Sequence, residues 1–197
     1  MKKSLLGLLL AVAMVVPVFA TDKGDMDLDL KLGYTLSNSV KVEYNGGNSD
    51  SGSTDKSFIL GADFYYYLLS NVALGVGINN IFDSTADYGW KDKYGFTNIY
   101  FAIKPKLDLQ SDIFTGIYGI AQIGYGILRL DYDTDGGPEP DKKNGLYWGI
   151  GAGAEIMKNF IFELIYSCNN ASFDLPNGSS DIKYSAFSVN VGYKFAL

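Results

Sequence analysis

Residues 27–36 carry the pattern that decides the fold, and they read Asp-Leu-Asp-Leu-Lys-Leu-Gly-Tyr-Thr-Leu. Every even-numbered residue of this stretch is leucine or tyrosine, and every odd-numbered residue is charged, polar or glycine. Successive side chains of a β-strand point to opposite faces, so an alternation of this kind indicates a strand with one apolar face and one polar face.

The same alternation recurs in seven further segments along the chain. Their apolar faces fall within residues 58–68, 72–78, 99–103, 117–127, 146–156, 160–166 and 187–195. Segments of about ten residues are long enough for a tilted strand to cross a bilayer. Long polar stretches (37–56, 82–95, 131–144 and 169–183) alternate with short turns between the segments. We therefore predict an all-β fold, an eight-stranded antiparallel up-and-down transmembrane β-barrel.

The composition of the two faces separates a membrane barrel from a soluble barrel, which alternates with apolar side chains inside. The polar faces here are rich in glycine, namely Gly33, Gly61, Gly75, Gly77, Gly149, Gly151, Gly153 and Gly192. Glycine weakens an exposed strand face, but inside a narrow barrel it leaves room for larger neighbours such as Tyr65 and Tyr67. This pattern favours the membrane barrel, with the polar face inside.

Aromatic residues of the apolar faces lie close to the ends of the predicted strands. The set at the long-loop end is Tyr34, Phe58, Trp148, Tyr166 and Phe187, and the set at the short-turn end is Phe160, Tyr193 and Phe195, with Phe64 or Tyr66. Aromatic side chains in such positions lie at the two interfaces of a membrane. We expect two aromatic girdles that contact outer-membrane lipids.

The N-terminus has the pattern of an export signal. Lys2 and Lys3 precede an apolar stretch at 5–16, and Val18-Phe19-Ala20 provides a cleavage site. The apolar stretch is short for a retained anchor, because a membrane-spanning helix needs about 20 apolar residues. We expect residues 1–20 to be a cleaved signal peptide and residues 21–197 to form the barrel domain.

Composition excludes several classes of function. The chain has no His and a single Cys, so it cannot form a Ser-His or Cys-His nucleophile pair, a His-ligated metal site or an intramolecular disulfide. Its formal net charge of −6 argues against nucleic acid as a partner, because nucleic acid requires a basic surface. We expect no catalytic residue and no cofactor.

The last predicted strand carries the most specific resemblance. Residues 187–195 read Phe-Ser-Val-Asn-Val-Gly-Tyr-Lys-Phe, which resembles the C-terminal insertion signal of outer-membrane barrels, although Ala196 and Leu197 follow the final aromatic residue. The mature chain as a whole is similar to the small outer-membrane β-barrel proteins of Gram-negative bacteria, the eight-stranded group of the OmpX, OmpW and OmpA-barrel types.

The resemblance implies a location in the outer membrane, insertion by the barrel assembly machinery, and a monomer surrounded by outer-membrane lipids and lipopolysaccharide. Some outer-membrane barrels are enzymes, but the deacylase, palmitoyltransferase, phospholipase and omptin protease types all use a His. Because this chain has none, we predict that it is not an enzyme.

Charged residues on the polar faces gather toward the short-turn end. They are Asp29, Lys31, Asp63, Lys104, Glu155, Glu163 and Lys194. One interpretation is an ion path or gate, and the other is a plug of salt bridges, since buried charges must pair. The lumen of an eight-stranded barrel is about filled by side chains, which favours the plug. Glu163 and Lys194, on adjacent strands, are one candidate pair.

Two features of the long loops suggest ligands. Asp131, Asp133 and Asp135 with Gly136 match the opening of a calcium-binding loop, but Lys142 stands where such loops have a bidentate Glu, so we favour a solvated acidic loop without metal. Basic residues near the loop end are candidates for contact with lipopolysaccharide phosphates or are ordinary loop charges: Lys41, Lys56, Lys91, Lys93, Arg129, Lys142, Lys143 and Lys183.

Two classes of function remain open. The first is a structural or surface-interaction role at the cell surface, exerted through the extracellular loops. The alternative is a narrow, porin-like channel or small-molecule transporter. The state of the lumen, closed or open, distinguishes them.

Overall fold

The computed structural model describes residues 23–44, 49–87, 91–131, 143–175 and 178–197. These residues form nine strands: β1 (Met26–Tyr44), β2 (Ser49–Ser53), β3 (Phe58–Leu69), β4 (Val72–Asp87), β5 (Lys91–Asp108), β6 (Phe114–Asp131), β7 (Lys143–Ile156), β8 (Phe160–Leu175) and β9 (Gly178–Ala196). In this part of the chain no helix is long and apolar enough to cross a membrane. The expected signal peptide, residues 1–20, lies outside the described residues.

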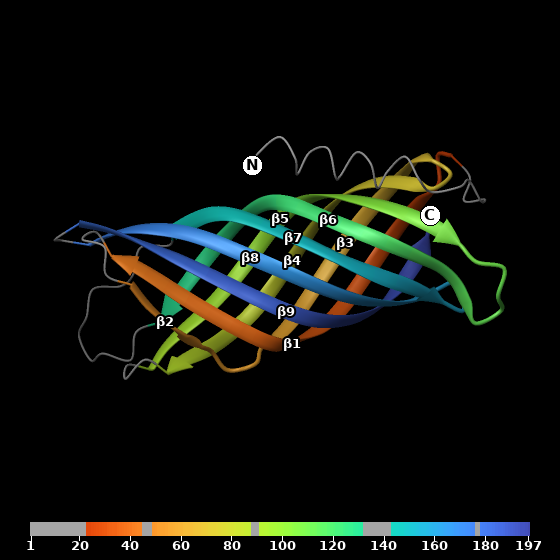
Figure 1. Ribbon diagram of the computed structural model, residues 1–197. Coiled ribbons are helices and arrows are strands. Elements are labelled where there is room, and N and C mark those ends of the chain that lie inside the picture. Colours follow the sequence, from red (N-terminus) through yellow and green to blue (C-terminus); the bar gives the residue numbers. More distant parts are fainter. Residues whose placement is uncertain (1–22, 45–48, 88–90, 132–142, 176–177) are drawn as a thin grey trace.

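Eight of the strands close into a barrel. Each strand from β3 to β8 pairs antiparallel with the strand that follows it. β1 pairs antiparallel with both β3 and β9, which closes the barrel. The result is an elongated cylinder of tilted strands (Figure 1). The short strand β2 pairs with the far end of β1 and does not take part in the closure. The predicted eight-stranded antiparallel barrel is confirmed.

The connections differ strongly between the two ends of the barrel. The β3–β4, β5–β6 and β7–β8 turns are short, as predicted, and the end of β9 lies beside them (Figure 1). In the β7–β8 turn, Met157 and Lys158 have positive φ angles of 49° and 67°, the backbone that a tight hairpin requires. We call this the turn end and the opposite end the loop end.

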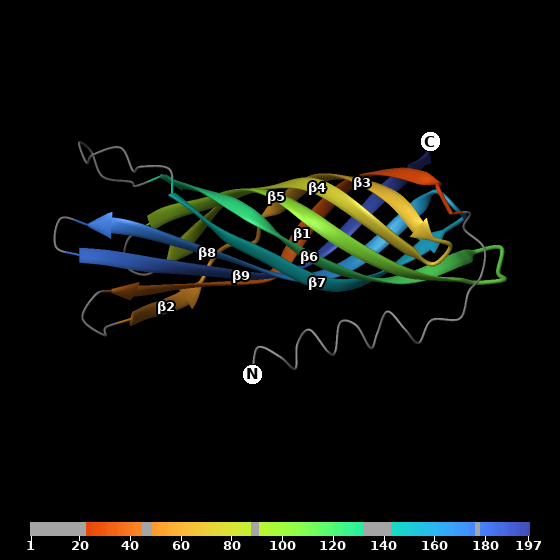
Figure 2. The same cartoon turned by 90° about the horizontal axis from the view of Figure 1, so that it is seen from above.

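The strands at the loop end are longer than the sequence indicated. The stretches 37–56, 82–95 and 169–183, expected to be loops, consist largely of strand in the structure. Figure 2 shows the β1–β2 and β8–β9 ends extending far along the barrel axis. The expectation was wrong because these strand ends carry polar residues on their outer face, which read as loop when the outer face is assumed to be apolar.

The barrel therefore has two zones of opposite polarity. In the zone next to the turn end, called the membrane zone, the outer face is apolar, with Leu32 63% and Phe101 70% exposed. In the zone beyond Leu36 of β1 and before Phe187 of β9, called the loop-end zone, Lys41 and Lys183 are on the outer face. Its interior is apolar instead: Val40, Val42, Ile182, Tyr184 and Ala186 are buried there.

A β-bulge in β1 marks the boundary between the zones. The register with β9 shifts between Thr35 and Ser37. Even-numbered residues of β1 face outward up to Leu36, and even-numbered residues from Asn38 onward face inward. One extra residue at a bulge changes which face the following side chains occupy. The membrane-facing leucines and the buried Val40 and Val42 thus have the same parity in the sequence, with Asn38 as the one polar residue between them.

Candidate functional site: the barrel lumen

Side chains inside the barrel form three layers along its axis. On β1, the inward residues run from Asp27, Asp29 and Lys31 through Gly33 and Thr35 to Val40 and Val42. On the paired strand β9 they run from Lys194 through Asn190 and Ser188 to Tyr184 and Ile182. From the turn end, we name these the ion-pair layer, the amide layer and the apolar layer.

Lys31 holds the upper part of the ion-pair layer together. Its Nζ lies 2.5 Å from Asp63 Oδ2 and 3.0 Å from Glu163 Oε2. Tyrosine hydroxyls also donate hydrogen bonds to both carboxylates. Asp63 accepts from Tyr65 (3.1 Å) and Tyr100 (2.6 Å), and Glu163 accepts from Tyr118 (3.1 Å). A buried charge is tolerated when it is paired and hydrogen-bonded in this way.

Lys104 forms the second cluster of the layer. Its Nζ lies 3.0 Å from Asp29 Oδ2, and both side chains are completely buried. The ammonium also lies 4.5 Å from the ring centroid of Tyr65 and 4.4 Å from that of Tyr118. Two aromatic faces around a desolvated cation add cation–π attraction to the ion pair.

The third cluster faces the turn end. Glu155 Oε2 lies 2.8 Å from Lys194 Nζ and 3.0 Å from Lys106 Nζ. Lys194 Nζ also lies 3.9 Å from Asp27, which accepts a 3.1 Å hydrogen bond from Tyr67. The ion-pair layer therefore blocks the lumen between Lys31 and a wide cavity of about 780 Å³ that opens at the turn end and is lined by Lys106, Glu155 and Lys194.

The structure buries all seven charged residues predicted for the lumen, but it pairs them differently. The predicted pair of Glu163 with Lys194 is wrong: Glu163 bonds to Lys31, and Lys194 bonds to Glu155. The register explains this, since Glu163 is opposite Asn190 in the β8–β9 ladder, four residues before Lys194. Alternation assigns a face to each residue, whereas pairing depends on the register and on the stagger around the barrel.

Four further residues of this layer were not in the predicted set of lumen charges, namely Asp27, Lys106, Tyr100 and Tyr118. A signal existed for Lys106, which has the same parity as Lys104 but lies beyond Pro105, where we expected the strand to be ending. Tyr118 also shares the inward parity of Gln122 on β6.

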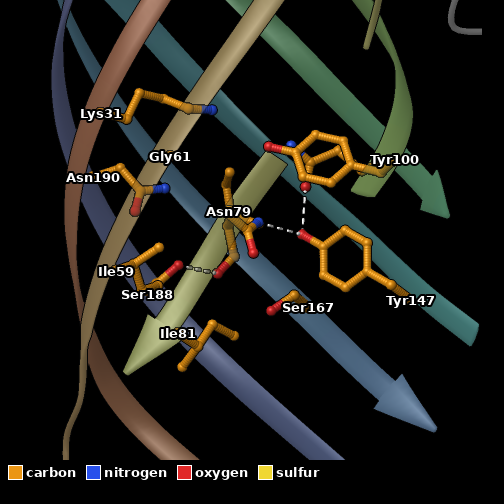
Figure 3. A pocket seen from close by; sticks show the side chains of 12 residues that line it. Lys31, Ile59, Gly61, Asn79, Ile81, Tyr100, Tyr147, Ser167, Ser188 and Asn190 are labelled. Carbon is orange, nitrogen blue, oxygen red and sulfur yellow. Dashed lines mark hydrogen bonds between the residues drawn. The ribbon is translucent and has the colours of Figure 1, made fainter. Parts of the chain in front are cut away.

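The amide layer consists of neutral polar side chains. Asn98 donates to Asn79 (2.8 Å), Asn79 donates to Tyr147 (3.4 Å), and Tyr147 donates to Gln122 (2.7 Å). Ser188 of this layer donates to the Ile165 carbonyl. Figure 3 shows Asn79, Tyr147 and Ser188 of this layer around a small cavity, with Lys31 on its turn-end side.

The apolar layer closes the loop end of the lumen. Its buried members are Val40, Val42, Ile81, Tyr94, Phe96, Leu128, Ala171, Ile182, Tyr184 and Ala186. The Phe96 and Tyr184 rings pack at a centroid distance of 5.0 Å. The sequence prediction contained no such layer, because it placed half of these residues in loops and the other half just outside the predicted strands.

The outward aromatic residues form small clusters at the two borders of the membrane zone. At its border with the loop-end zone, which lies in mid-strand, Tyr34 packs on Phe58 and Trp148 on Tyr166, and Phe187 is exposed. Near the turn end, Tyr193 packs on both Phe160 and Phe195. Their exposure on the outer face is compatible with the proposed contact with lipid interfaces.

The proposed calcium loop lies almost entirely beyond the described residues. Asp131 is the last residue of β6, and Asp133 and Asp135 fall outside the described ranges. Within those ranges, no group of three or more His, Cys, Asp or Glu side chains has an arrangement that could hold a metal ion.

Basic residues of the loop-end zone lie on its outer face. Lys41 and Lys183 are register partners on β1 and β9, and both approach Glu43, at 2.7 and 3.6 Å. The hydrogen bond from Lys41, with the charge of Lys183, lowers the pKa of Glu43 below its ordinary value. On the opposite wall, Arg129 bonds to Asn80 and Thr97 at 2.7 and 2.9 Å.

The closed antiparallel barrel, its apolar exterior and its charged interior have a match among known families. The family described as "Outer membrane protein beta-barrel domain" matches residues 6–195. This chain belongs to that family. Members are located in the outer membrane, which agrees with the exposed apolar band of the membrane zone. No curated protein matches the sequence.

Solved structures share the fold of this outer-membrane barrel at low sequence identity. Ail, the attachment invasion locus protein of Yersinia pestis, is 15% identical with a TM-score of 0.51; the match covers 88% of this chain and 100% of Ail. Neisserial surface protein A is 15% identical with a TM-score of 0.50, covering 86% and 97%. OprG of Pseudomonas aeruginosa is 12% identical with a TM-score of 0.49, covering 89% and 98%.

Proposed function

We propose that this outer-membrane barrel is closed and non-enzymatic, and that it acts at the cell surface through its loop-end zone. The observation that carries the proposal is the filling of the lumen by two different layers in series. A permeating ion would have to displace the paired charges around Lys31, Lys104 and Glu155, and would then have to cross the apolar layer. Transfer of an unpaired ion from water into apolar surroundings costs on the order of several kcal/mol.

The absence of an enzymatic role is supported by the residue inventory. The chain has no His, and its one thiol, Cys168, is buried. The inward carboxylates with assigned partners are held by lysines and tyrosines, so they are neutralised rather than poised for acid–base chemistry. These facts support a barrel whose interior serves stability.

Lipopolysaccharide is the partner that we propose for the outer face of the loop-end zone. Lys41 and Lys183 lie side by side there, just beyond the apolar band, at the level that phosphate groups of the outer leaflet would occupy. Both lysines approach Glu43, and Asp181 is the register partner of Glu43, so the two ammonium groups as hydrogen-bond donors, rather than a net positive charge, would bind an anionic head group.

Planar-bilayer recording tests the closed lumen. We expect no discrete conductance steps from the purified wild-type protein. Reproducible steps that change when Glu163 or Lys194 is substituted would favour the alternative function, a narrow channel or small-molecule transporter. The double variant Phe96→Ala/Lys31→Ala, which thins both layers, tests whether the assay detects an opened lumen.

The proposed lipid contact needs a separate measurement. In vesicles that contain lipopolysaccharide, we expect Lys41→Glu/Lys183→Glu to lose most of the stabilisation that the wild type gains over plain phospholipid. Lys23→Glu/Lys158→Glu, at two exposed residues of the turn end, is the matched control because it makes the same charge change on the opposite side of the membrane. Equal losses in both variants would contradict a contact at the loop end.

A further inference from the structure

The amide layer contains a cavity that the closed-barrel proposal does not use. Its volume is about 20 Å³, and it lies between Lys31 of the ion-pair layer and Ile81 of the apolar layer. Figure 3 shows Lys31, Asn79, Tyr147 and Asn190 approaching this space from different strands. A cavity needs about 10–15 Å³ of such space to hold one water molecule, so the room here is for one or two.

The hydrogen-bond chain that borders the cavity runs in one direction and is open at both ends. It starts at Asn98, passes through Asn79 and Tyr147, and ends at Gln122. Its first acceptor, Asn98 Oδ1, and its last donor, Gln122 Nε2, are buried and have no hydrogen-bond partner among the described residues. Each link uses the groups that face it, so rotating one amide would break a bond elsewhere in the chain.

Other buried side-chain amides next to this hydrogen-bond chain also have atoms without a hydrogen-bond partner among the described residues. Asn190 lines the cavity from β9, and its Oδ1, which lies against Gly33, has no partner in the described part of the chain; neither amide atom of Asn169 has one either. Asn169 and Asn98 are neighbours, since both amide oxygens lie close above Gly126. Burying so many unpaired donors and acceptors is unfavourable, and native interiors satisfy such groups with ordered water.

We propose that the cavity is a binding site for one or two water molecules, which accept a hydrogen bond from Gln122 Nε2 and donate one to Asn190 Oδ1. A neutral ligand that both donates and accepts is required here. The Lys31 ammonium faces the cavity and repels a cation, while Asp63 and Glu163 beside it disfavour an anion. Water meets both conditions and the size limit.

Water–protein NMR on the full barrel in lipid nanodiscs tests the proposal. With labelled side-chain amides, we expect a cross-peak between water and the Gln122 amide protons, with the sign of a long-lived complex. Methyl groups of Val40 in the apolar layer should show none. An assigned Gln122 amide without a water cross-peak would overturn the proposal, as would the sign of freely exchanging bulk water.

Glycine substitutions provide the matched pair of variants. A Cβ at Gly61 would meet Asn79 Cβ at 3.4 Å and Lys31 Cε at 3.8 Å, so Gly61→Ala fits and should keep the cross-peak at reduced intensity. Gly61→Val fills the cavity, and we expect loss of the cross-peak. Gly119→Val is the control, because a Cβ there meets only Pro105 on the outer face.

Each remaining outcome decides the proposal. Persistence of the full cross-peak in Gly61→Val would overturn it. A cross-peak that disappears when sodium or chloride is raised would identify an ion as the occupant and would also overturn it. If Gly61→Val does not fold, the wild-type spectrum and Gly61→Ala still decide.

Discussion

The membrane zone and the loop-end zone use one continuous set of β-ladders and opposite chemistry. Below the bulge in β1, leucine and aromatic side chains face outward and charged residues face inward; above it, Lys41 and Lys183 face outward and Val40 and Ile182 face inward. The backbone pairing is the same in both zones, so the surrounding medium selects the side chains. Lipid surrounds one zone and water surrounds the other.

Because the two zones have interiors of opposite polarity, different kinds of substitution should destabilise each zone. The interior of the membrane zone depends on ion pairs that have no water to replace a lost partner. The interior of the loop-end zone depends on apolar burial, which water outside the barrel makes favourable. A substitution that destabilises the interior of one zone should therefore leave the interior of the other zone folded.

The largest effect is expected for Lys31→Met, which leaves Asp63 and Glu163 buried without their shared cation. Breaking a buried ion pair by removing one partner costs about 3–5 kcal/mol. Urea unfolding in lipid vesicles measures this cost. The triple variant with Asp63→Asn and Glu163→Gln should recover much of the loss, and an unchanged unfolding midpoint for Lys31→Met alone would show that these charges do not support the barrel.

In the apolar layer, Leu128→Ala should cost about 2–5 kcal/mol, the usual cost of a leucine-sized cavity in a core. Hydrogen exchange locates this cost. We expect faster exchange in the loop-end parts of β5, β6 and β7 and little change for amides around Lys104. Uniformly faster exchange along the whole barrel would contradict the separation into zones.

On the outer face, Leu32→Arg should cost about 2–4 kcal/mol, because a cation near the middle of the lipid face is unfavourable. The same substitution at Ser39, an exposed residue of the same strand, should be close to neutral. Unfolding of both variants in one bilayer composition measures the difference. Equal costs would mean that the lipid boundary does not lie at the bulge.

The smallest effect concerns Glu43. The hydrogen bond from Lys41 lowers the Glu43 pKa, so its contribution to stability is present above the ordinary glutamate range and is lost as pH falls through the lowered pKa. Lys41→Met should move this pKa upward toward its ordinary value, as measured by NMR titration of the Glu43 carboxyl group. A Glu43 pKa that does not move would indicate that Lys183 alone sets it.

The sequence predicted the barrel, the strand number and the inward position of the charged residues, because each depends only on a repeat of two. Residues such as Asp29 and Lys104 are recognisable one strand at a time. The pairing of Glu163 with Lys31 was not predictable in this way, because it joins strands that are not ladder partners and depends on the stagger of the whole barrel.

The loop-end zone escaped prediction for a different reason. Its outward residues, such as Ser39 and Lys41, look like loop residues when an apolar exterior is assumed. The inward residues Val40 and Val42 have the same parity as the lipid-facing leucines, and no residue type announces the bulge that separates them. Two solvents around one strand cannot be inferred from its alternation alone.

The bulge at Leu36 shifts the phase of β1 by one residue, so every side chain after it occupies the opposite face from the one that the earlier alternation predicts. Apolar residues keep even numbers on both sides of it, with Asn38 between them, but the face that an even-numbered residue occupies changes from outward to inward. Deleting that one residue would restore a single frame and turn Val40 and Val42 toward water and Lys41 into the apolar layer. On β1 the position at which the barrel leaves the membrane is therefore set by a shift of phase, whereas on β9 the inward residues keep one parity and change from Asn190 and Ser188 to Tyr184 and Ile182.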